Sequence, residues 1–302
     1  MLRSAPAWAG DLSEMRRSEE QSGERRVYGL ILVGAGTVLW SLAGLFVRTI
    51  DLGLWDLILW RSLFACLCLV AIAIARPAEA VRFDWRFCLA AYFSATAMFC
   101  YVAALTMTTV ANVLIIYATL PFVTAALAFA VGREAASRRL LMASTVSIIG
   151  IVLVAGTALG ASDIKGNLLA FAMTLSFGAL LIVTRRNRAL NLIHVNAAGA
   201  ALCAIAAFPF SSGQLPGYGA LALIFMLALL TTALAFLLFL AGGRHVASSE
   251  SALIALLDVV LGPLWVWLAF AENPGKWAIA GGSIVVAAVV WYFWPSLRRS
   301  RS

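Results

Sequence analysis

Charged residues are scarce in this chain of 302 residues. Only 12% of the residues are Asp, Glu, Lys or Arg, about half the usual share in soluble proteins, whereas 63% are apolar. A soluble protein of this length has too much surface to be covered by so few charges. The composition therefore excludes disorder, a nucleic-acid-binding arm and an ordinary soluble enzyme, and it predicts a protein whose solvent is lipid.

Cysteine and histidine are also few, and neither forms a catalytic or metal-binding pattern. All five cysteines fall inside apolar runs, so we expect small buried side chains rather than disulfides or metal ligands. The histidines, His194 and His245, are at or near loops, and no His-Glu-x-x-His, Gly-x-Ser-x-Gly or Walker sequence is present. The sequence predicts no catalytic residue, no metal and no cofactor, with an intramembrane enzyme kept as the alternative class.

Long apolar runs dominate what is present. A bilayer core requires about 20 apolar residues per helix. Ten segments meet this requirement: 28–48, 54–75, 86–105, 110–131, 138–157, 166–184, 191–210, 217–241, 247–271 and 276–294. Residues 1–26 are polar and contain no apolar signal-peptide region, so we expect the first helix to direct insertion. The sequence thus predicts an all-α, multi-pass integral membrane protein.

The basic residues predict the orientation of these helices. With the N-terminus in the cytoplasm, 18 Lys and Arg residues fall on the cytoplasmic side, and only Arg48, Lys165 and Lys276 fall on the other side. Cytoplasmic loops of membrane proteins carry such an excess. Both termini are therefore predicted to be cytoplasmic, in a bacterial-type inner membrane.

The chain also predicts an internal repeat. A shift of 138 residues pairs Tyr101 with Phe239 and Asn112 with Glu250, and a shift of 137 pairs Trp40 with Phe177. These shifts divide the ten predicted helices into two sets of five. Because five is an odd number, the second set enters the membrane from the opposite face, as in many secondary transporters. The predicted organisation is a polar tail (1–26), a first five-helix repeat (27–157), a linker (158–165), a second, inverted repeat (166–294) and a basic tail (295–302).

Short motifs accompany this plan in a fixed order. They are Leu39-Trp40-Ser41, Trp60-Arg61-Ser62-Leu63-Phe64-Ala65, Tyr101-Val102-Ala103-Ala104-Leu105, Leu120-Pro121-Phe122, Gly132-Arg133-Glu134 and Ala269-Phe270-Ala271-Glu272. In these motifs the chain resembles the drug/metabolite transporter superfamily, in its EamA-like branch of bacterial ten-helix exporters. One departure is Asp258-Val259, where the family usually has a Glu-Pro or similar pair, so a kink in the ninth helix is not assured.

The resemblance implies a carrier for a small molecule, with a central cavity lined by both repeats. Amino-acid exporters of the YddG type belong to this branch, so export of neutral or aromatic amino acids by alternating access is the leading expectation. Export of drugs, cations or other metabolites is the alternative within the superfamily. The expected partners are a small-molecule substrate and the lipid bilayer, with protons as a candidate coupling ion and without nucleic acid, and the sequence leaves monomer and homodimer open.

Aromatic and polar residues in the middle of the membrane are the candidate site. Aromatic walls with a few polar groups suit an amphipathic small molecule, although most aromatic residues in such a chain serve helix packing. The candidates for the cavity are Trp40, Phe99, Tyr101, Asn112, Tyr117, Phe177, Phe239, Glu250 and Asp258. Pro121 is expected to kink the fourth helix and to serve as a hinge.

Three ionisable residues have alternative interpretations. Asp258 lies near the bilayer centre, where a charge is unfavourable by roughly 2.5–3.5 kcal/mol, so it binds a substrate amine or a proton, or is a hydrogen-bonded structural acid. Glu250 contacts substrate or takes part in gating, or is stabilised by the N-terminal end of its helix. Arg61 holds a substrate carboxylate, or is structural.

Overall fold

The computed structural model describes residues 7–50, 52–75, 83–108, 110–132, 135–155, 164–270 and 275–299. Within these ranges the chain forms helices and short connections and no strand. The helices are α1 (Ala7–Ser41), α2 (Ala43–Thr49), α3 (Leu54–Ala75), α4 (Trp85–Met107), α5 (Val110–Tyr117), α6 (Leu120–Gly132) and α7 (Arg138–Ala155), and then α8 (Ile164–Arg186), α9 (Leu192–Ala207), η2 (Phe208–Phe210), α10 (Tyr218–Leu227), η3 (Ala228–Leu234), α11 (Ala235–Gly243), α12 (Ser248–Ala255), α13 (Leu257–Phe270) and α14 (Gly275–Arg299). The predicted linker at 158–165 lies mostly outside the described residues.

Seven helical stretches in the described part of the chain are long and apolar enough to cross a membrane. They are Leu54–Ala75, Trp85–Ala104, Ile115–Gly132, Ile164–Arg186, Leu192–Phe210, Tyr218–Gly243 and Ser248–Ala269. The predicted first span falls on α1 and α2, the fifth on α7 and the tenth on α14. Of these three, within the described residues, only α14 contains a further apolar segment, the shorter helix Ile279–Pro295. The all-helical membrane architecture is confirmed, and the count of ten crossings stays a prediction.

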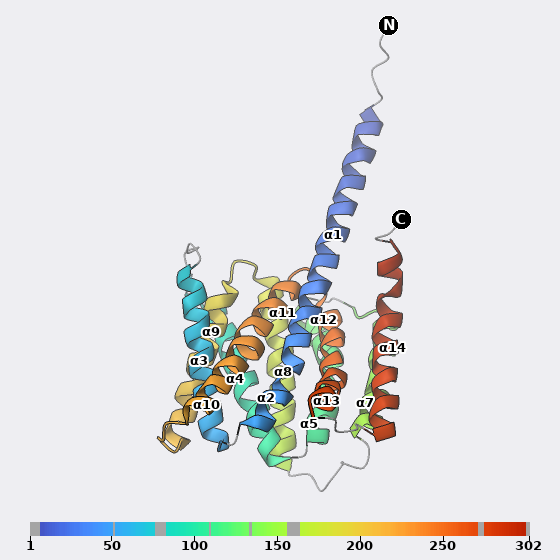
Figure 1. Ribbon diagram of the computed structural model, residues 1–302. Coiled ribbons are helices and arrows are strands. Elements are labelled where there is room, and N and C mark those ends of the chain that lie inside the picture. The colour runs from blue at the N-terminus through green and yellow to red at the C-terminus, as the bar shows by residue number, and fades with distance from the viewer. Residues whose placement is uncertain are drawn as a thin grey trace.

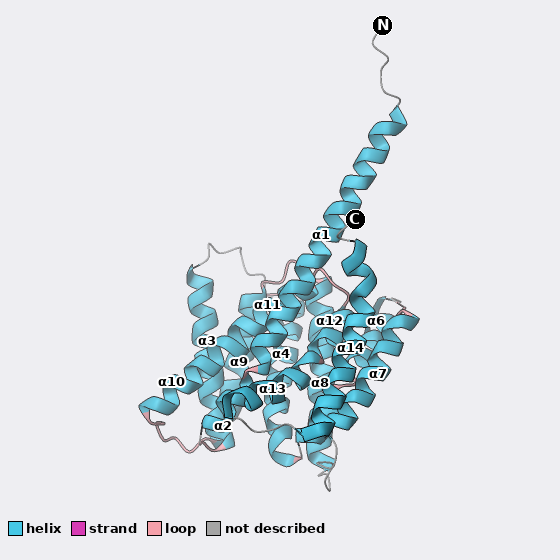
Figure 2. Ribbon diagram, turned by 45° about the vertical axis from the view of Figure 1, so that its right-hand side comes forward, coloured by secondary structure: helices cyan, strands magenta, loops and turns pink. Residues whose placement is uncertain are grey.

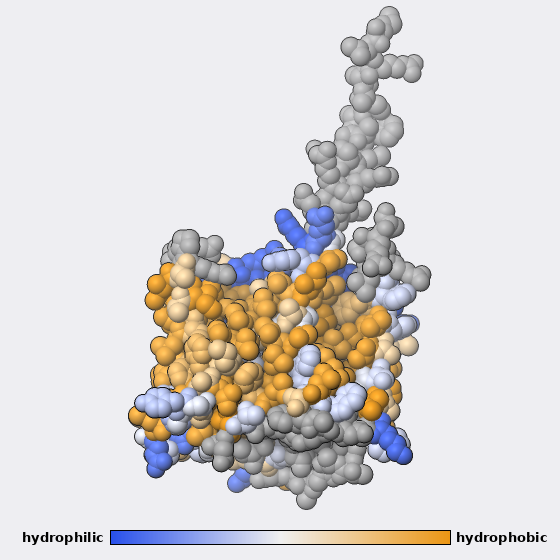
Figure 3. All heavy atoms as spheres, in the orientation of Figure 1, coloured by the Kyte–Doolittle hydropathy of each residue, from blue (hydrophilic) through white to orange (hydrophobic). Residues whose placement is uncertain are grey.

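The outer surface of the helix bundle is apolar. Large apolar side chains such as Ile74, Leu168 and Ile205 are more than half exposed. Figure 3 shows such side chains as a continuous band, with hydrophilic residues above and below it. A soluble protein rarely exposes an apolar surface of this extent, whereas lipid tails solvate one well.

Helices α1 and α8, which begin the two sequence repeats, run in opposite directions. Gly29, where α1 (Ala7–Ser41) enters the bundle, packs against His245, and Arg188, just after the end of α8, donates a hydrogen bond to the carbonyl of Arg244. The start of α1 and the end of α8 therefore share one face, which we call the N-terminal face. At the other face, Thr108 is hydrogen-bonded to Asn167 at the start of α8. Figure 1 shows that α14 ends at the same side from which α1 enters the bundle.

Two helices are interrupted at equivalent places. Residues 118–119 separate α5 from α6, and Leu256 separates α12 from α13. Ala118 and Leu256 correspond under the 138-residue shift found in the sequence. Pro121 lies in the first turn of α6, where its missing N–H would have had no helical partner. The second interruption has no proline, and Leu256 and Val259 instead make short-range bonds to the carbonyls of Leu253 and Leu256.

Close packing of α1 against α11 holds the repeats together. A Cβ added to Gly36 would lie 2.8 Å from the carbonyl oxygen of Ala235, and one added to Gly242 would lie 2.6 Å from that of Gly29. Small residues at such positions let helix backbones approach closely in membranes. Figures 1 and 2 both show α1 lying along α11.

Candidate functional site

A cavity of about 270 Å³ lies between helices of both repeats. Its polar lining residues are Ser41, Arg61, Tyr101, Tyr117, Thr231, Thr232 and Asp258, and its apolar lining residues are Trp40, Ala43, Ala97, Met98, Met173, Phe177, Phe236, Val259 and Gly262. Both helix interruptions border it, because Tyr117 ends α5 and Asp258 lies in the first turn of α13. The lining thus combines apolar walls with a few polar groups, as small-molecule sites do.

Six of the residues singled out in the sequence line this cavity. They are Trp40 of α1, Arg61 of α3, Tyr101 of α4, Tyr117 of α5, Phe177 of α8 and Asp258 of α13. Helices that are distant in sequence therefore bring them together. Tyr101 has 36% of its surface accessible, although it belongs to a helix inside the bundle, so part of that surface faces the cavity.

The structure places the other candidates elsewhere. Phe99 stacks on Trp55 at 5.8 Å between ring centroids, and Phe239 is fully buried behind Trp40. Glu250 pairs with Arg26 and does not line the cavity. The side chain of Asn112 lies outside the described part of the structure.

Several lining residues have no counterpart among the sequence candidates. Thr231, Thr232 and Phe236 come from the η3 segment and the start of α11, and Met98 and Met173 come from α4 and α8. The adjacent threonines within an apolar run were a usable signal. The direction of their side chains could not be predicted, because it depends on a π-helical turn that the sequence does not indicate.

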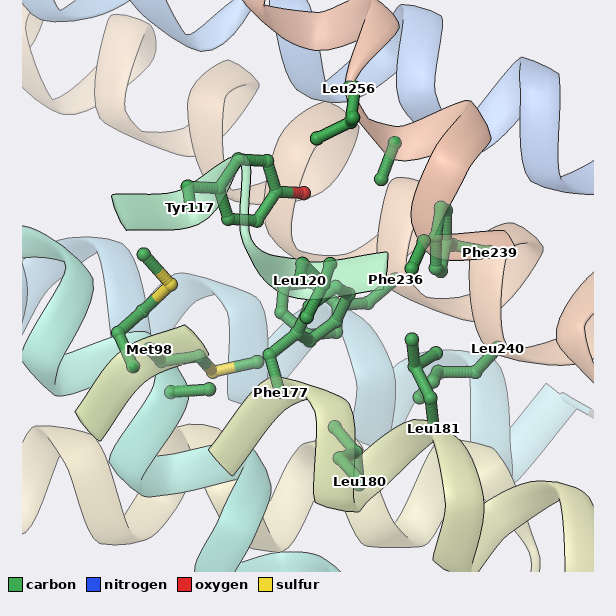
Figure 4. Close-up of a cluster of buried hydrophobic side chains, with 14 of the residues drawn as sticks. Met98, Tyr117, Leu120, Phe177, Leu180, Leu181, Phe236, Phe239, Leu240 and Leu256 are labelled. Carbon is green, nitrogen blue, oxygen red and sulfur yellow. The ribbon is translucent and has the colours of Figure 1, made fainter. Parts of the chain in front are cut away.

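Three aromatic rings form one wall of the cavity, and a fourth packs behind them. Trp40 contacts Phe177 and Phe236 edge-to-face, with ring centroids 5.2 Å and 4.6 Å apart. Phe239 completes the cluster at 5.4 Å from Trp40. Figure 4 shows Phe177 and Phe236 beside Leu120, at the start of α6. Such ring pairs stabilise packing by about 0.5–1.5 kcal/mol beyond the burial of their area, so this wall is rigid.

Arg61 and Asp258, a basic and an acidic residue on the same lining, do not pair with each other. Within the described residues neither makes a hydrogen bond or an ion pair, and the Nε atom of Arg61 is buried without a partner. Both lie within electrostatic range of Tyr101. Charges inside a membrane protein usually pair with one another or mark a path for ligands. Here both side chains line the cavity, and neither has a partner side chain within the described residues.

Buried apolar layers close the cavity toward the N-terminal face. Leu181 of α8 and Leu240 of α11 each lie one turn beyond a lining phenylalanine, and both are almost fully buried. Leu253 and Leu256 of the interrupted helix are also fully buried there. This side of the cavity is therefore packed shut.

An ionic contact lies beyond these layers, at the N-terminal face. Glu250, in the first turn of α12, accepts hydrogen bonds from Arg26 Nη2 at 2.8 Å and from the Tyr292 hydroxyl at 2.7 Å. Glu250 is 8% exposed, and Arg26 is more accessible. The contact joins α1 of the first repeat to α12 and α14 of the second. We call it the Glu250 clamp.

The described residues contain no group of three or more His, Cys, Asp or Glu side chains that could hold a metal ion. The cysteines described are free thiols within or beside the helices.

Apolar helices, two repeats and an internal cavity with unpaired polar groups together define a multi-pass integral membrane protein of the transporter class. The model of the EamA-like transporter family matches residues 27–156 and again residues 164–294. The chain belongs to the EamA-like transporter family, as two family repeats in tandem.

Two further comparisons bear on the fold. A solved structure described as "Crystal structure of protein" has a TM-score of 0.78 at 17% identity, covering 89% of this chain and 98% of that chain. At this identity the likeness shows the fold alone. Among curated proteins, no match to the chain was found.

Proposed function

We propose that the protein is a secondary transporter that exports small zwitterionic metabolites, with amino acids as the leading class. Membership of the EamA-like family supports a transporter of the drug/metabolite type. The observation that carries the substrate class is the pair of unpaired opposite charges, Arg61 and Asp258, on one small cavity. A single amino acid offers a carboxylate to the guanidinium and an ammonium to the carboxylate, which satisfies both buried charges at once.

The rest of the lining fits the same class of ligand. A volume of about 270 Å³ is at the small end of ligand sites, which favours a metabolite over a large drug. The aromatic wall of Trp40, Phe177 and Phe236 offers an apolar surface to a neutral or aromatic side chain. An organic cation would leave Arg61 unpaired and close to a like charge, so it fits less well.

The orientation follows from the basic residues of the N-terminal face. Arg25, Arg26, Arg186, Arg188 and Arg244 lie there, which supports a cytoplasmic N-terminal face in a bacterial-type inner membrane. Under this proposal, the closed packing of this side corresponds to a state closed to the cytoplasm. Export by alternating access then requires the clamp and the buried layers to separate before a cytoplasmic substrate enters.

Transport in proteoliposomes tests the substrate class. We expect uptake or counterflow of at least one neutral or aromatic amino acid from a panel of radiolabelled amino acids. Both Asp258→Asn and Arg61→Gln should reduce it strongly, because each leaves one buried charge of the site or of the ligand unpaired. Asp56→Asn is the matched control, since Asp56 accepts a hydrogen bond from the Ser212 amide outside the cavity and an asparagine oxygen can still accept it.

Two results would contradict the proposal, and a third would exclude a proton site at Asp258. Transport of organic cations or sugar nucleotides without amino acids would move the protein to another substrate class of the superfamily. Enzymatic turnover by the purified protein would favour an intramembrane enzyme. For proton coupling, an unchanged pH profile of transport in Asp258→Asn would remove Asp258 as the proton site.

A further inference from the structure

The η3 segment, Ala228–Leu234, is a π-helical turn within an otherwise α-helical span. The corresponding part of the first repeat is continuous, because α4 runs without interruption from Trp85 to Met107. Wide turns of this kind are rare and are frequently found at functional sites. The second repeat therefore carries a local distortion that the repeat symmetry does not require.

The wide turn changes which side chains reach the cavity. Positions five residues apart, such as Thr231 and Phe236, are about 140° apart around a regular α-helix and would not share one face. In the structure Thr231, Thr232 and Phe236 all line the cavity. A turn closed between residues five apart brings such positions onto one side. The distortion thus explains why Thr231 joins a wall that Thr232 already shares with Phe236, which is four residues further on and only about 40° away around a regular α-helix.

The two hydroxyl groups differ in their partners. Thr231 donates to the carbonyl oxygen of Leu227 at 2.7 Å, so its proton is used within the helix. Thr232 is 3% exposed, and its hydroxyl makes no hydrogen bond within the described residues. A buried hydroxyl without a partner is unfavourable unless a ligand or water completes it. Its position on the lining makes a ligand in the cavity the natural partner.

The cavity separates its charges onto different walls. Segment η3 packs against α3, the helix that carries Arg61, and also against α1, whereas α13 with Asp258 packs against α1, α2 and α14. The segment that carries Thr232 is therefore a direct neighbour of the helix that carries the arginine. A carboxylate accepts several hydrogen bonds. A guanidinium and a neighbouring hydroxyl can both donate to it, so that both of its oxygen atoms have hydrogen-bond partners.

We propose that Thr232 is a specificity-determining residue, whose hydroxyl donates a hydrogen bond to the carboxylate of the transported amino acid alongside Arg61. This inference rests on the proposed function. It adds that ligands without a carboxylate gain nothing from this hydroxyl.

The test compares Thr232→Val, which removes the hydroxyl at nearly constant volume, with wild-type protein in proteoliposomes. The probes are the best-transported amino acid of the panel and its decarboxylated amine as a competitor. We expect the KM for the amino acid to rise about tenfold or more, as for a lost hydrogen bond to a charged group, with inhibition by the amine unchanged. Thr232→Ser, which keeps the hydroxyl, should restore the wild-type KM.

Thr184→Val is the matched control. Thr184 is equally buried, and its hydroxyl bonds to the Leu180 carbonyl at 2.7 Å away from the cavity, so we expect no change in KM. An unchanged KM in Thr232→Val, or an equal loss for amino acid and amine, overturns the role of Thr232 and leaves the proposed function intact. Absence of any amino-acid transport by the wild-type protein overturns both.

Discussion

The Glu250 clamp gives a prediction about how the N-terminal face opens. In Glu250→Gln the side chain keeps its shape and can still accept hydrogen bonds, but the charge that attracts Arg26 is gone. Breaking exposed ion pairs costs about 0–1 kcal/mol, and breaking fully buried pairs costs about 3–5 kcal/mol. The Glu250 side chain is 11% exposed and that of Arg26 is 41% exposed, so solvent screens part of the interaction. A loss of about 1–2 kcal/mol is reasonable for this geometry.

That loss has a measurable consequence for the conformational equilibrium. A change of about 1–2 kcal/mol increases the population open at the N-terminal face about five- to thirtyfold. Ser251 is fully buried beside the clamp, so a cysteine at this position reacts with a water-soluble maleimide only when the face opens. We expect Ser251→Cys to react faster by this factor when combined with Glu250→Gln. The background is Cys88→Ser, which removes the exposed native thiol.

Two controls decide whether the clamp is responsible. Glu24→Gln removes an exposed acid from α1 near the same face and should leave the labelling rate unchanged. Exchanging the charges, with Arg26→Glu and Glu250→Arg together, should recover part of the wild-type rate. If Glu250→Gln reacts no faster than the parent protein, the ion pair does not hold this face closed and the reasoning is wrong.

Two further predictions concern stability in detergent. Burial, and then the charges of Arg188, Arg25 and Arg244, lower the pKa of His245, in the turn before α12, below its ordinary 6.5. The unfolded chain binds the proton first as pH falls below about 6.5, so stability should decrease there, and this part of the pH dependence of the melting temperature should vanish in His245→Gln. Gly36→Ala should destabilise by about 1–3 kcal/mol, because its Cβ would meet the α11 backbone at 2.8 Å, whereas Gly34→Ala, with nothing within 4 Å, should be neutral or slightly stabilising in the same melting assay.

The sequence predicted the helical membrane class and the family, and six of the residues it singled out line the cavity. Trp40 and Phe177 illustrate why, since a repeated chain folded around a pseudo-symmetry axis brings paired positions together at the centre. Phe99 and Phe239 show the limit of that argument. A helix that is apolar on all sides does not show which face meets lipid and which meets the interior of the bundle. The depth of these residues in the membrane could therefore be predicted, but the direction of their side chains could not.

The interruption at Leu256 shows a second limit. Without a proline, a kink in the ninth span was not assured, yet α12 ends and α13 begins there. The structure gives a physical reason. Asp258 falls in the first turn of α13, where the positive end of the helix dipole stabilises an acidic side chain, so a new helix start is favourable at this point.

The separation of Arg61 from Asp258 has a consequence for how the protein enters the membrane. Helix α3 is synthesised about 200 residues before Asp258 exists, so no opposite charge on α13 helps it to insert. An arginine at the centre of a helix opposes insertion by about 2.5–3.5 kcal/mol. The span Leu54–Ala75 has a mean hydropathy of 2.4, among the highest in the chain. Its leucines, isoleucines and phenylalanine therefore offset the unfavourable insertion of the arginine. The insertion of Arg61 does not depend on an opposite charge from Asp258.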